Sequence, residues 1–400
     1  MPNLRTMVTE VGTGLGLLGP GDLDQVLAER SPVMRSLSPE DWDSLAAARA
    51  GGAFDSEFHA AWENGRAFLA ARDGLRGRLP EAVEWKGSIR GSGDEVAPID
   101  LRIDHVYLVS CKYLSNILFN VSPSHVFDDL LLGGPGRRGR GTGGDWYAEV
   151  APEPYQALYD TVRRLVQDEV VEGAVLSGGG AGGLSALARP IGSLVPAPAL
   201  PGLEVVDPGQ RPDQAAPAVA RPAAAVLGEL PMRAVDLTSA QRVALSDRLK
   251  SGWPGQAKAA YRELSDVVAQ ASANRWRGSL SGAGSAGAGE AMLWRLLRMG
   301  SAPYFVLGSS PTQSLRLRIA TPWDWRQLFA LVRFEVFAQA GGQPRVGWLA
   351  TVRERASGQL HEVAGHVEVR WSHGRFGGLP EAKGYLDTRH QLVPGYVPLR

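Results

Sequence analysis

The stretch Pro98-Ile-Asp-Leu-Arg-Ile-Asp-His-Val-Tyr-Leu-Val-Ser-Cys-Lys-Tyr113 decides how the first half of the chain is expected to fold. It holds two short runs of alternating apolar and polar residues, Ile99 to Ile103 and Val106 to Val109, separated by a polar dipeptide. This alternation around a short turn is typical of a β-hairpin. The sequence therefore predicts two antiparallel strands, with Asp100 at the start of the first and Lys112 at the end of the second.

The register of this hairpin decides whether Asp100 and Lys112 share a face of the sheet. A two-residue turn would put the two side chains on opposite faces. A turn one residue longer pairs Ile103 with Tyr107. Asp100 then lies across from Ser110 and on the face of Lys112, because side chains alternate with a period of two. The longer turn also gathers the apolar residues on the other face, and we therefore favour it.

A carboxylate and an ammonium on neighbouring strands are what a metal-dependent phosphodiesterase requires. Asp100 would hold Mg²⁺ (or Mn²⁺), and Lys112 would stabilise charge on the phosphate or orient the attacking water. Ser110 would support them by hydrogen bonding. Aspartate at a strand start and lysine at a strand end are also frequent on exposed sheets, so a purely structural interpretation stays open.

Two elements of this stretch, Pro98-Ile-Asp100 and Ser110-Cys-Lys112, resemble the motif of the PD-(D/E)xK nuclease superfamily, the fold of many restriction endonucleases. The resemblance covers roughly residues 55 to 132, with a helix, a strand and the hairpin in the α-β-β-β order of that fold. Ser110 stands where the motif has its second acid. The resemblance is therefore to a variant of the motif.

The resemblance implies further metal ligands. Some members with serine at this position take a carboxylate from the following helix, which here corresponds to Asp128 or Asp129. Members often add an upstream glutamate, which here corresponds to Glu84. The implied function is a metal-dependent endonuclease that hydrolyses DNA phosphodiester bonds, double-stranded DNA before RNA, in bacterial restriction or anti-phage defence. A protein partner in a defence complex and a homodimer are compatible with this function.

Length and composition set the limits of this interpretation. A chain of 400 residues exceeds one ordinary core and predicts two domains. Its 42 basic and 42 acidic residues cancel, so nucleic acid would have to meet local patches. The single cysteine, Cys111, excludes a disulfide framework and fits a reducing compartment. Without a long apolar run or a signal-like start, we expect a cytoplasmic protein that does not bind membranes.

Composition divides the chain into a flexible leader (1–37), a nuclease-like domain (38–176), a Gly/Ala/Pro-rich linker (177–232) and a second domain (233–400). The leader contains the glycine-rich run Gly12-Thr-Gly-Leu-Gly16, which no strand precedes, so a mobile terminus is expected. The expected fold class is α/β for the nuclease-like domain, with a mixed central sheet and flanking helices. The second domain is expected to be α+β, with helices before strands, and to bind a partner or nucleic acid.

Basic, polar and aromatic residues outside the motif are candidates for nucleic-acid contacts. Two follow Lys112 directly, three lie in a glycine-rich segment, and four alternate at the end of a predicted strand in the second domain. Arginines bind phosphates and aromatic rings stack on bases. Equally open are a plain surface loop for the second group and a structural tryptophan with an internal Glu–Arg pair for the third. The candidates are Tyr113, Asn116, Arg137, Arg138, Arg140, Arg370, Trp371, His373 and Arg375.

A second class of function stays open beside the nuclease. The balanced charge and the long linker are common in non-enzymatic assembly proteins, which would dock a protein or a nucleic acid through the second domain. Cleavage of nucleic acid in the presence of a divalent ion separates the two classes. No feature of the sequence indicates recognition of a 2′-hydroxyl, which would distinguish RNA from DNA, so an RNA-directed nuclease also stays open.

Overall fold

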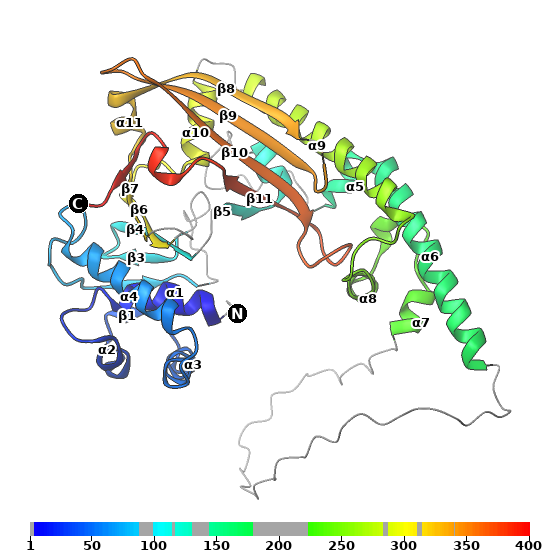
Figure 1. The fold of residues 1–400 in the computed structure, drawn as a ribbon, viewed down its shortest axis with the longest axis horizontal. Coiled ribbons are helices and arrows are strands. Elements are labelled where there is room, and N and C mark those ends of the chain that lie inside the picture. The colour runs from blue at the N-terminus through cyan, green and yellow to red at the C-terminus, as the bar shows by residue number, and fades with distance from the viewer. Residues whose placement is uncertain are drawn as a thin grey trace, which may run out of the picture.

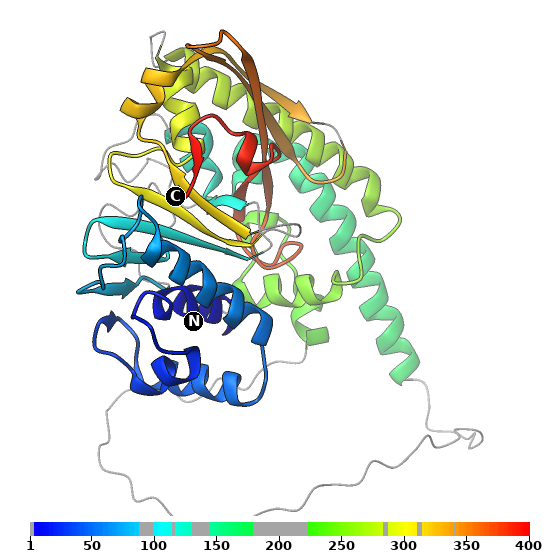
Figure 2. The same ribbon diagram turned by 60° about the vertical axis from the view of Figure 1, so that its left-hand side comes forward.

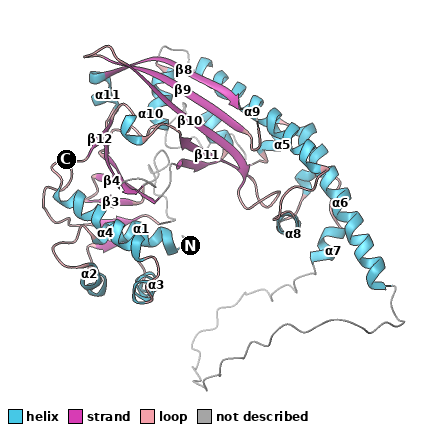
Figure 3. Cartoon of the chain, in the orientation of Figure 1, coloured by secondary structure: helices cyan, strands magenta, loops and turns pink. Residues whose placement is uncertain are grey.

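The computed structural model describes residues 4–87, 99–113, 117–129, 144–178, 223–282, 287–309, 314–339 and 341–400. Within these residues, a seven-stranded mixed sheet and a five-stranded antiparallel sheet carry the fold (Figures 1 and 3). The first belongs to a mixed α/β region, and the second to an α+β region towards the C-terminus. Both fold classes expected from the sequence are therefore confirmed.

The seven-stranded sheet has the order β1-β2-β3-β4-β6-β7-β12 in the described chain. The strands β2, β3 and β4 form an antiparallel meander, and β6 then pairs parallel to β4. The outer pairs β6–β7 and β7–β12 are antiparallel. Its strands are β1 (Met34–Arg35), β2 (Val83–Trp85), β3 (Leu101–Ile103), β4 (Tyr107–Tyr113), β6 (Tyr304–Ser309), β7 (Ser314–Ile319) and β12 (Tyr396–Pro398).

The first 37 residues are not the flexible leader that their glycines suggested. They contain α1 (Leu4–Leu15), whose residues from Met7 to Leu15 are buried, and α2 (Leu23–Glu29). A Cβ added at Gly16 would collide with the backbone of α4 (Asp55–Ala70), and one added at Gly65 with the backbone of α1. The glycines therefore let two helix backbones approach closely, which is a packing role and not a loop role.

Helices α1 and α4 cover the face of the first sheet that carries the apolar side chains of the hairpin (Figure 2). Leu101, Ile103 and Val109 on this face are fully buried in the same core cluster as Val8 and Phe58 of the two helices. This is the apolar face expected from the sequence. The polar residues of the hairpin are left on the opposite face or at the strand ends.

The five-stranded sheet has the order β5-β11-β10-β9-β8 in the described chain. The helix α9 packs against β8 and β9, and α6 packs against α9, so these long helices run along the outer side of the sheet (Figure 1). The strands are β5 (Ile117–Val121), β8 (Phe329–Gln339), β9 (Arg345–Glu354), β10 (Leu360–Trp371) and β11 (Pro380–Leu386), and the helices are α6 (Pro152–Gly178) and α9 (Ala257–Gly282).

Each sheet combines strands from both sides of the predicted linker. The strands β6, β7 and β12 complete the first sheet, and β5 joins the second through β11. Residues 179–222 of that linker lie outside the described residues. In the described chain, no helix is both long enough and apolar enough to cross a bilayer. The other helical elements are α3 (Pro39–Ala50), η1 (His125–Asp129), α5 (Trp146–Val150), α7 (Ala223–Gly228), η2 (Ala234–Asp236), α8 (Ser239–Arg248), α10 (Ala288–Leu296), α11 (Pro322–Leu328) and η3 (His390–Leu392).

Candidate functional site

The hairpin has the register that the apolar pattern favoured. Ile103 pairs with Tyr107, and Leu101 pairs with Val109. The turn between them uses left-handed backbone, with φ of 49° at Asp104 and 60° at His105. This confirms the longer turn, and it brings Asp100, the residue before β3, to the side of Ser110.

The Asp100 carboxylate is held by β4 at one of its oxygens. Its Oδ2 accepts a hydrogen bond from the backbone N–H of Cys111 at 2.6 Å and one from the Ser110 hydroxyl at 3.1 Å. Burial raises the pKa of the Asp100 carboxyl, while the Lys112 ammonium and these two hydrogen bonds act in the opposite direction. The Ser110 hydroxyl and the Cys111 N–H therefore fix one oxygen of the Asp100 carboxylate.

Lys112 lies near the end of β4, beside Gly308 of β6. A Cβ at Gly308 would collide with the backbone carbonyl of Lys112, so a glycine is needed for β6 to approach here. Burial lowers the pKa of the Lys112 ammonium, and the nearby Asp100 carboxylate counteracts this effect. Asp100 and Lys112 thus interact across adjoining strands, as the predicted register requires.

A second acid reaches this site from α1, and the sequence interpretation missed it. Glu10 is 8% exposed, and its Oε2 accepts a hydrogen bond from Nε1 of Trp85 at 2.6 Å. Burial, and then the charge of Asp100, raise the pKa of Glu10 to about 8, while Lys112 lowers it. Glu10, Asp100 and Lys112 therefore form one electrostatic cluster. The signal in the sequence was the helical spacing of the apolar residues around Glu10.

Two of the other acids proposed as ligands, Glu84 and Asp128, have ion-pair partners of their own. Glu84 lies opposite Arg102 on β3, and its nearest ion-pair partner is His105 at 3.1 Å. Asp128 in η1 forms an ion pair with Arg275 of α9 at 3.1 Å. Neither acid is among the groups that shift the pKa of Asp100. Asp129 closes η1, and its side chain lies outside the described part of the structure.

The predicted aromatic contact for bases is wrong, because Trp371 belongs to the core. Its side chain is 7% exposed and packs edge-on against Tyr147, with ring centroids 4.6 Å apart. A ring buried in this way offers no face to a base. Two neighbouring candidates are not part of the core. His373 is exposed, and Arg370 forms an ion pair with Glu381 at 3.3 Å.

Other nucleic-acid candidates are bound to the protein or lie outside the described residues. Arg375 donates to the carbonyl oxygen of Leu249 at 2.7 Å and lies 5.2 Å above the ring of Trp253. Its side chain therefore has a structural role. Asn116, Arg137, Arg138 and Arg140 and the side chain of Tyr113 fall outside the described residues, so their predicted contacts stay predictions.

The carboxylate oxygens of Glu10 and Asp100 are donors that suit a divalent cation. Mg²⁺ binds hard oxygen ligands, and it often uses one or two carboxylates together with water and substrate phosphate oxygens. Glu10 and Asp100 supply two such carboxylates whose pKa values are raised by burial, which means that a cation would favour their ionised forms. In the described residues no group of three or more His, Cys, Asp and Glu side chains is arranged around a common metal position.

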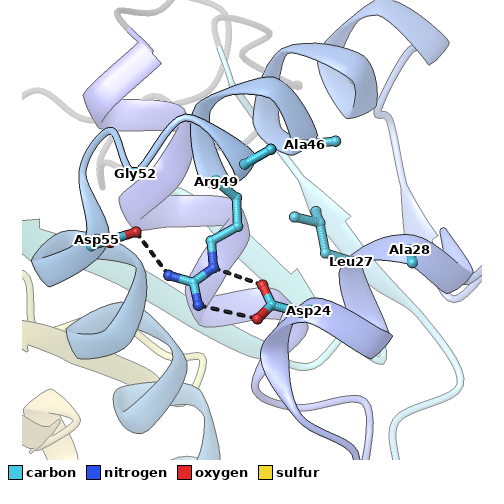
Figure 4. A pocket seen from close by; sticks show the side chains of 8 residues that line it. Asp24, Leu27, Ala28, Ala46, Arg49, Gly52 and Asp55 are labelled. Carbon is cyan, nitrogen blue, oxygen red and sulfur yellow. Dashed lines mark hydrogen bonds and ion pairs between the residues drawn. The ribbon is translucent and has the colours of Figure 1, made fainter.

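A surface hollow of about 560 Å³ lies away from this cluster, among α2, α3 and the start of α4 (Figure 4). Arg49 crosses it and donates from Nε to Asp24 at 2.7 Å and from Nη1 to Asp55 at 2.8 Å. The Asp24 and Asp55 carboxylates thus already bind the guanidinium. Arg49 therefore links α2, α3 and the start of α4 across this hollow.

Comparisons of this chain with protein-family models, with curated proteins and with solved structures find no match. The functional interpretation therefore rests on the geometry of the Glu10, Asp100 and Lys112 cluster.

Proposed function

We propose that this protein is a metal-dependent nuclease that hydrolyses phosphodiester bonds of DNA. The observation that carries the proposal is that Asp100 and Lys112 come from adjoining strands and interact through their charges, and that Glu10 of α1 interacts electrostatically with both. Two acids and an amine in one partly desolvated place match the needs of phosphodiester hydrolysis. The role in restriction or anti-phage defence follows the family resemblance alone.

The arrangement of the elements supports the same proposal. The helix α4 and the strands β2, β3 and β4 follow one another in the α-β-β-β order that the resemblance implies. Asp100 precedes β3 and Lys112 lies in β4, which is compatible with the order of the two elements in the resemblance. In this proposal Glu10 of α1 would supply the acid that is absent at Ser110.

Each residue of the cluster has a distinct task in this proposal. Asp100 and Glu10 would hold Mg²⁺, which when bound neutralises phosphate charge and lowers the pKa of water. Ser110 and the Cys111 N–H fix one oxygen of Asp100, which orients the carboxylate. Lys112 would donate to a phosphate oxygen or to the attacking water. Its lowered pKa makes the ammonium a better proton donor than an ordinary lysine.

A non-enzymatic binding or assembly role is the second candidate. It is favoured by the lack, among the described residues, of a group of three or more metal-ligating side chains. Ser110 in place of an acid points the same way. In that case the Asp100–Lys112 interaction would stabilise the sheet and the second domain would dock the partner.

Plasmid cleavage tests the proposal. Supercoiled DNA is incubated with the full chain and Mg²⁺ or Mn²⁺, and with the variants Asp100→Ala and Lys112→Ala, whose folding is checked by circular dichroism. A matched control is Arg353→Ala, an exposed strand residue away from the hairpin. Metal-dependent cleavage that both site variants lose and the control keeps supports the nuclease. Cleavage that survives in the folded site variants, or its absence in the wild type on DNA and RNA alike, contradicts it.

A further inference from the structure

The strand β8 is a long edge of the five-stranded sheet. It comprises eleven residues, and in the described chain it pairs with β9 on one side and with no strand on the other (Figure 1). The other strands at the borders of the two sheets, β1, β5 and β12, have two, five and three residues. The backbone N–H and C=O groups on the outer side of an edge strand can hydrogen-bond to an added strand. Among the described strands, β8 therefore offers the longest border for such an addition.

The edge strand is accessible to solvent along its length. Only one of its eleven residues, Val336, is buried. The apolar side chains of Val332 and Phe337 are 48% and 42% exposed, and Leu328, the residue before the strand, is 55% exposed. Exposed apolar side chains gathered at an open strand edge are a feature of surfaces that bind another protein.

Two opposite charges lie in the middle of this edge. Arg333 and Glu335 are two residues apart in the regular ladder with β9, so their side chains lie on the same face of the sheet. They form an ion pair with each other, and their side chains are 66% and 34% exposed. A bulge between Leu331 and Arg333 precedes them. Charges and bulges at an edge oppose pairing with an unmatched strand, so they restrict which strand can be added here.

A second copy of β8 matches this charge pattern in one register. Two identical strands that pair antiparallel are related by a two-fold axis perpendicular to the sheet, so one residue lies opposite its own copy. With the axis at Phe334, Arg333 lies opposite Glu335 of the partner subunit, and this pair occurs twice. With the axis at Arg333 or at Glu335, two like charges would lie opposite each other. Opposite charges stabilise a cross-strand pair and like charges destabilise it, which favours the axis at Phe334.

We propose that two copies of this chain dimerise by antiparallel pairing of their β8 strands about Phe334, which joins the two five-stranded sheets into one continuous sheet. The backbone groups of the edge supply hydrogen bonds, and the two Arg333–Glu335 pairs across the axis fix the register. The inference does not depend on the nuclease proposal, because no residue of the Glu10, Asp100 and Lys112 cluster takes part.

Sedimentation of the full chain in the analytical ultracentrifuge tests the interface. We expect the wild type to form a dimer. Arg333→Glu and Glu335→Arg should each weaken dimerisation by about tenfold or more, because each places two pairs of like charges across the axis. The matched control is Arg353→Glu, which reverses the charge of an exposed arginine in β9 and should leave dimerisation unchanged. Circular dichroism checks that each variant is folded.

A mixture of the two charge variants separates the interface from the ion pair within one chain. In a heterodimer of Arg333→Glu with Glu335→Arg, opposite charges face each other again at both positions, so the mixture should dimerise about as well as the wild type. Each chain still carries two like charges of its own, so repair of the pair within one chain cannot give this result. The inference is overturned if the wild type is monomeric at about 100 μM, if the dimer withstands both single substitutions, or if the mixture stays monomeric.

Discussion

Glu10→Gln should remove a loss of stability that the wild-type protein undergoes between pH 5 and pH 8. Burial, and next the charge of Asp100, raise the pKa of Glu10 from 4.5 to about 8 in the folded protein. Between these two pKa values the Glu10 carboxyl stays protonated in the folded protein and is ionised in the unfolded chain. The free energy of unfolding therefore falls as the pH rises from the unfolded pKa towards the folded one.

The size of the effect follows from the size of the pKa change. One pKa unit corresponds to about 1.4 kcal/mol, and between pH 5 and pH 8 the rise contributes at most about 3.5 kcal/mol, because the unfolded carboxyl is already largely ionised at pH 5 and the folded one is half ionised at pH 8. Part of the rise reflects repulsion by Asp100, which shares the cost of ionisation, so we expect about 2–3.5 kcal/mol. Glutamine cannot ionise, and its amide oxygen still accepts the hydrogen bond from Trp85.

Urea unfolding at pH 5 and pH 8 measures this difference directly. The wild type should lose about 2–3.5 kcal/mol more than Glu10→Gln over this range, since the two proteins differ in no other titrating side chain. Added Mg²⁺ should return part of the loss at pH 8 in the wild type and little in the variant. If the free energy of unfolding depends on pH in the same way in both proteins, burial does not raise the pKa of Glu10 and this reasoning is refuted.

Four further substitutions probe the packing and the hairpin. Gly16→Ala should lower the free energy of unfolding by about 1–3 kcal/mol, because the added Cβ collides with the backbone of α4. Gly278→Ala in α9, where the space is open, should raise it by about 0.5–1 kcal/mol. Urea unfolding measures both changes. Trp371→Ala should lower the free energy of unfolding by about 3–5 kcal/mol, because it removes a large buried side chain, and urea unfolding measures the loss. Ser110→Ala removes one of two hydrogen bonds to Asp100 and should slow plasmid cleavage by about tenfold. An unchanged rate would show that Ser110 does not orient the Asp100 carboxylate.

The hairpin was predictable because its information is local. The apolar residues of both runs fall on one face in just one of the two registers considered, and that face is the one that α1 and α4 bury. The same reasoning predicted a helix and a strand before the hairpin, which correspond to α4 and β2. In each case the pattern lies within a single segment.

Glu10 was missed because its environment is not local. The run of glycines from Gly12 to Gly16 has the composition of a mobile terminus, and its meaning appears only when α4, with Gly65, packs against it. A buried acid in an apparent leader gives no sign of its partners. The second carboxylate of the site therefore depends on a contact between segments far apart in the sequence.

Trp371 shows the same limit in the second sheet. The alternation in β10 predicted a strand and the two faces of that strand. It did not predict which face would be covered, because the covering side chain of Tyr147 comes from α5, far away in the chain. The neighbouring arginines look alike in the sequence, and only the folded chain shows that Arg375 is tied to Leu249.

The most direct measurement of the central claim compares the rates of Mg²⁺-dependent plasmid cleavage by Glu10→Gln and Glu84→Gln. Both glutamates are acids near the hairpin, but Glu10 interacts with Asp100 and Lys112, while Glu84 pairs with His105. We expect Glu10→Gln to lose about 100-fold or more in rate, as for the loss of a ligand that holds the metal, and Glu84→Gln to keep a rate close to the wild type. A wild-type rate for Glu10→Gln together with an inactive Glu84→Gln would contradict the site described here.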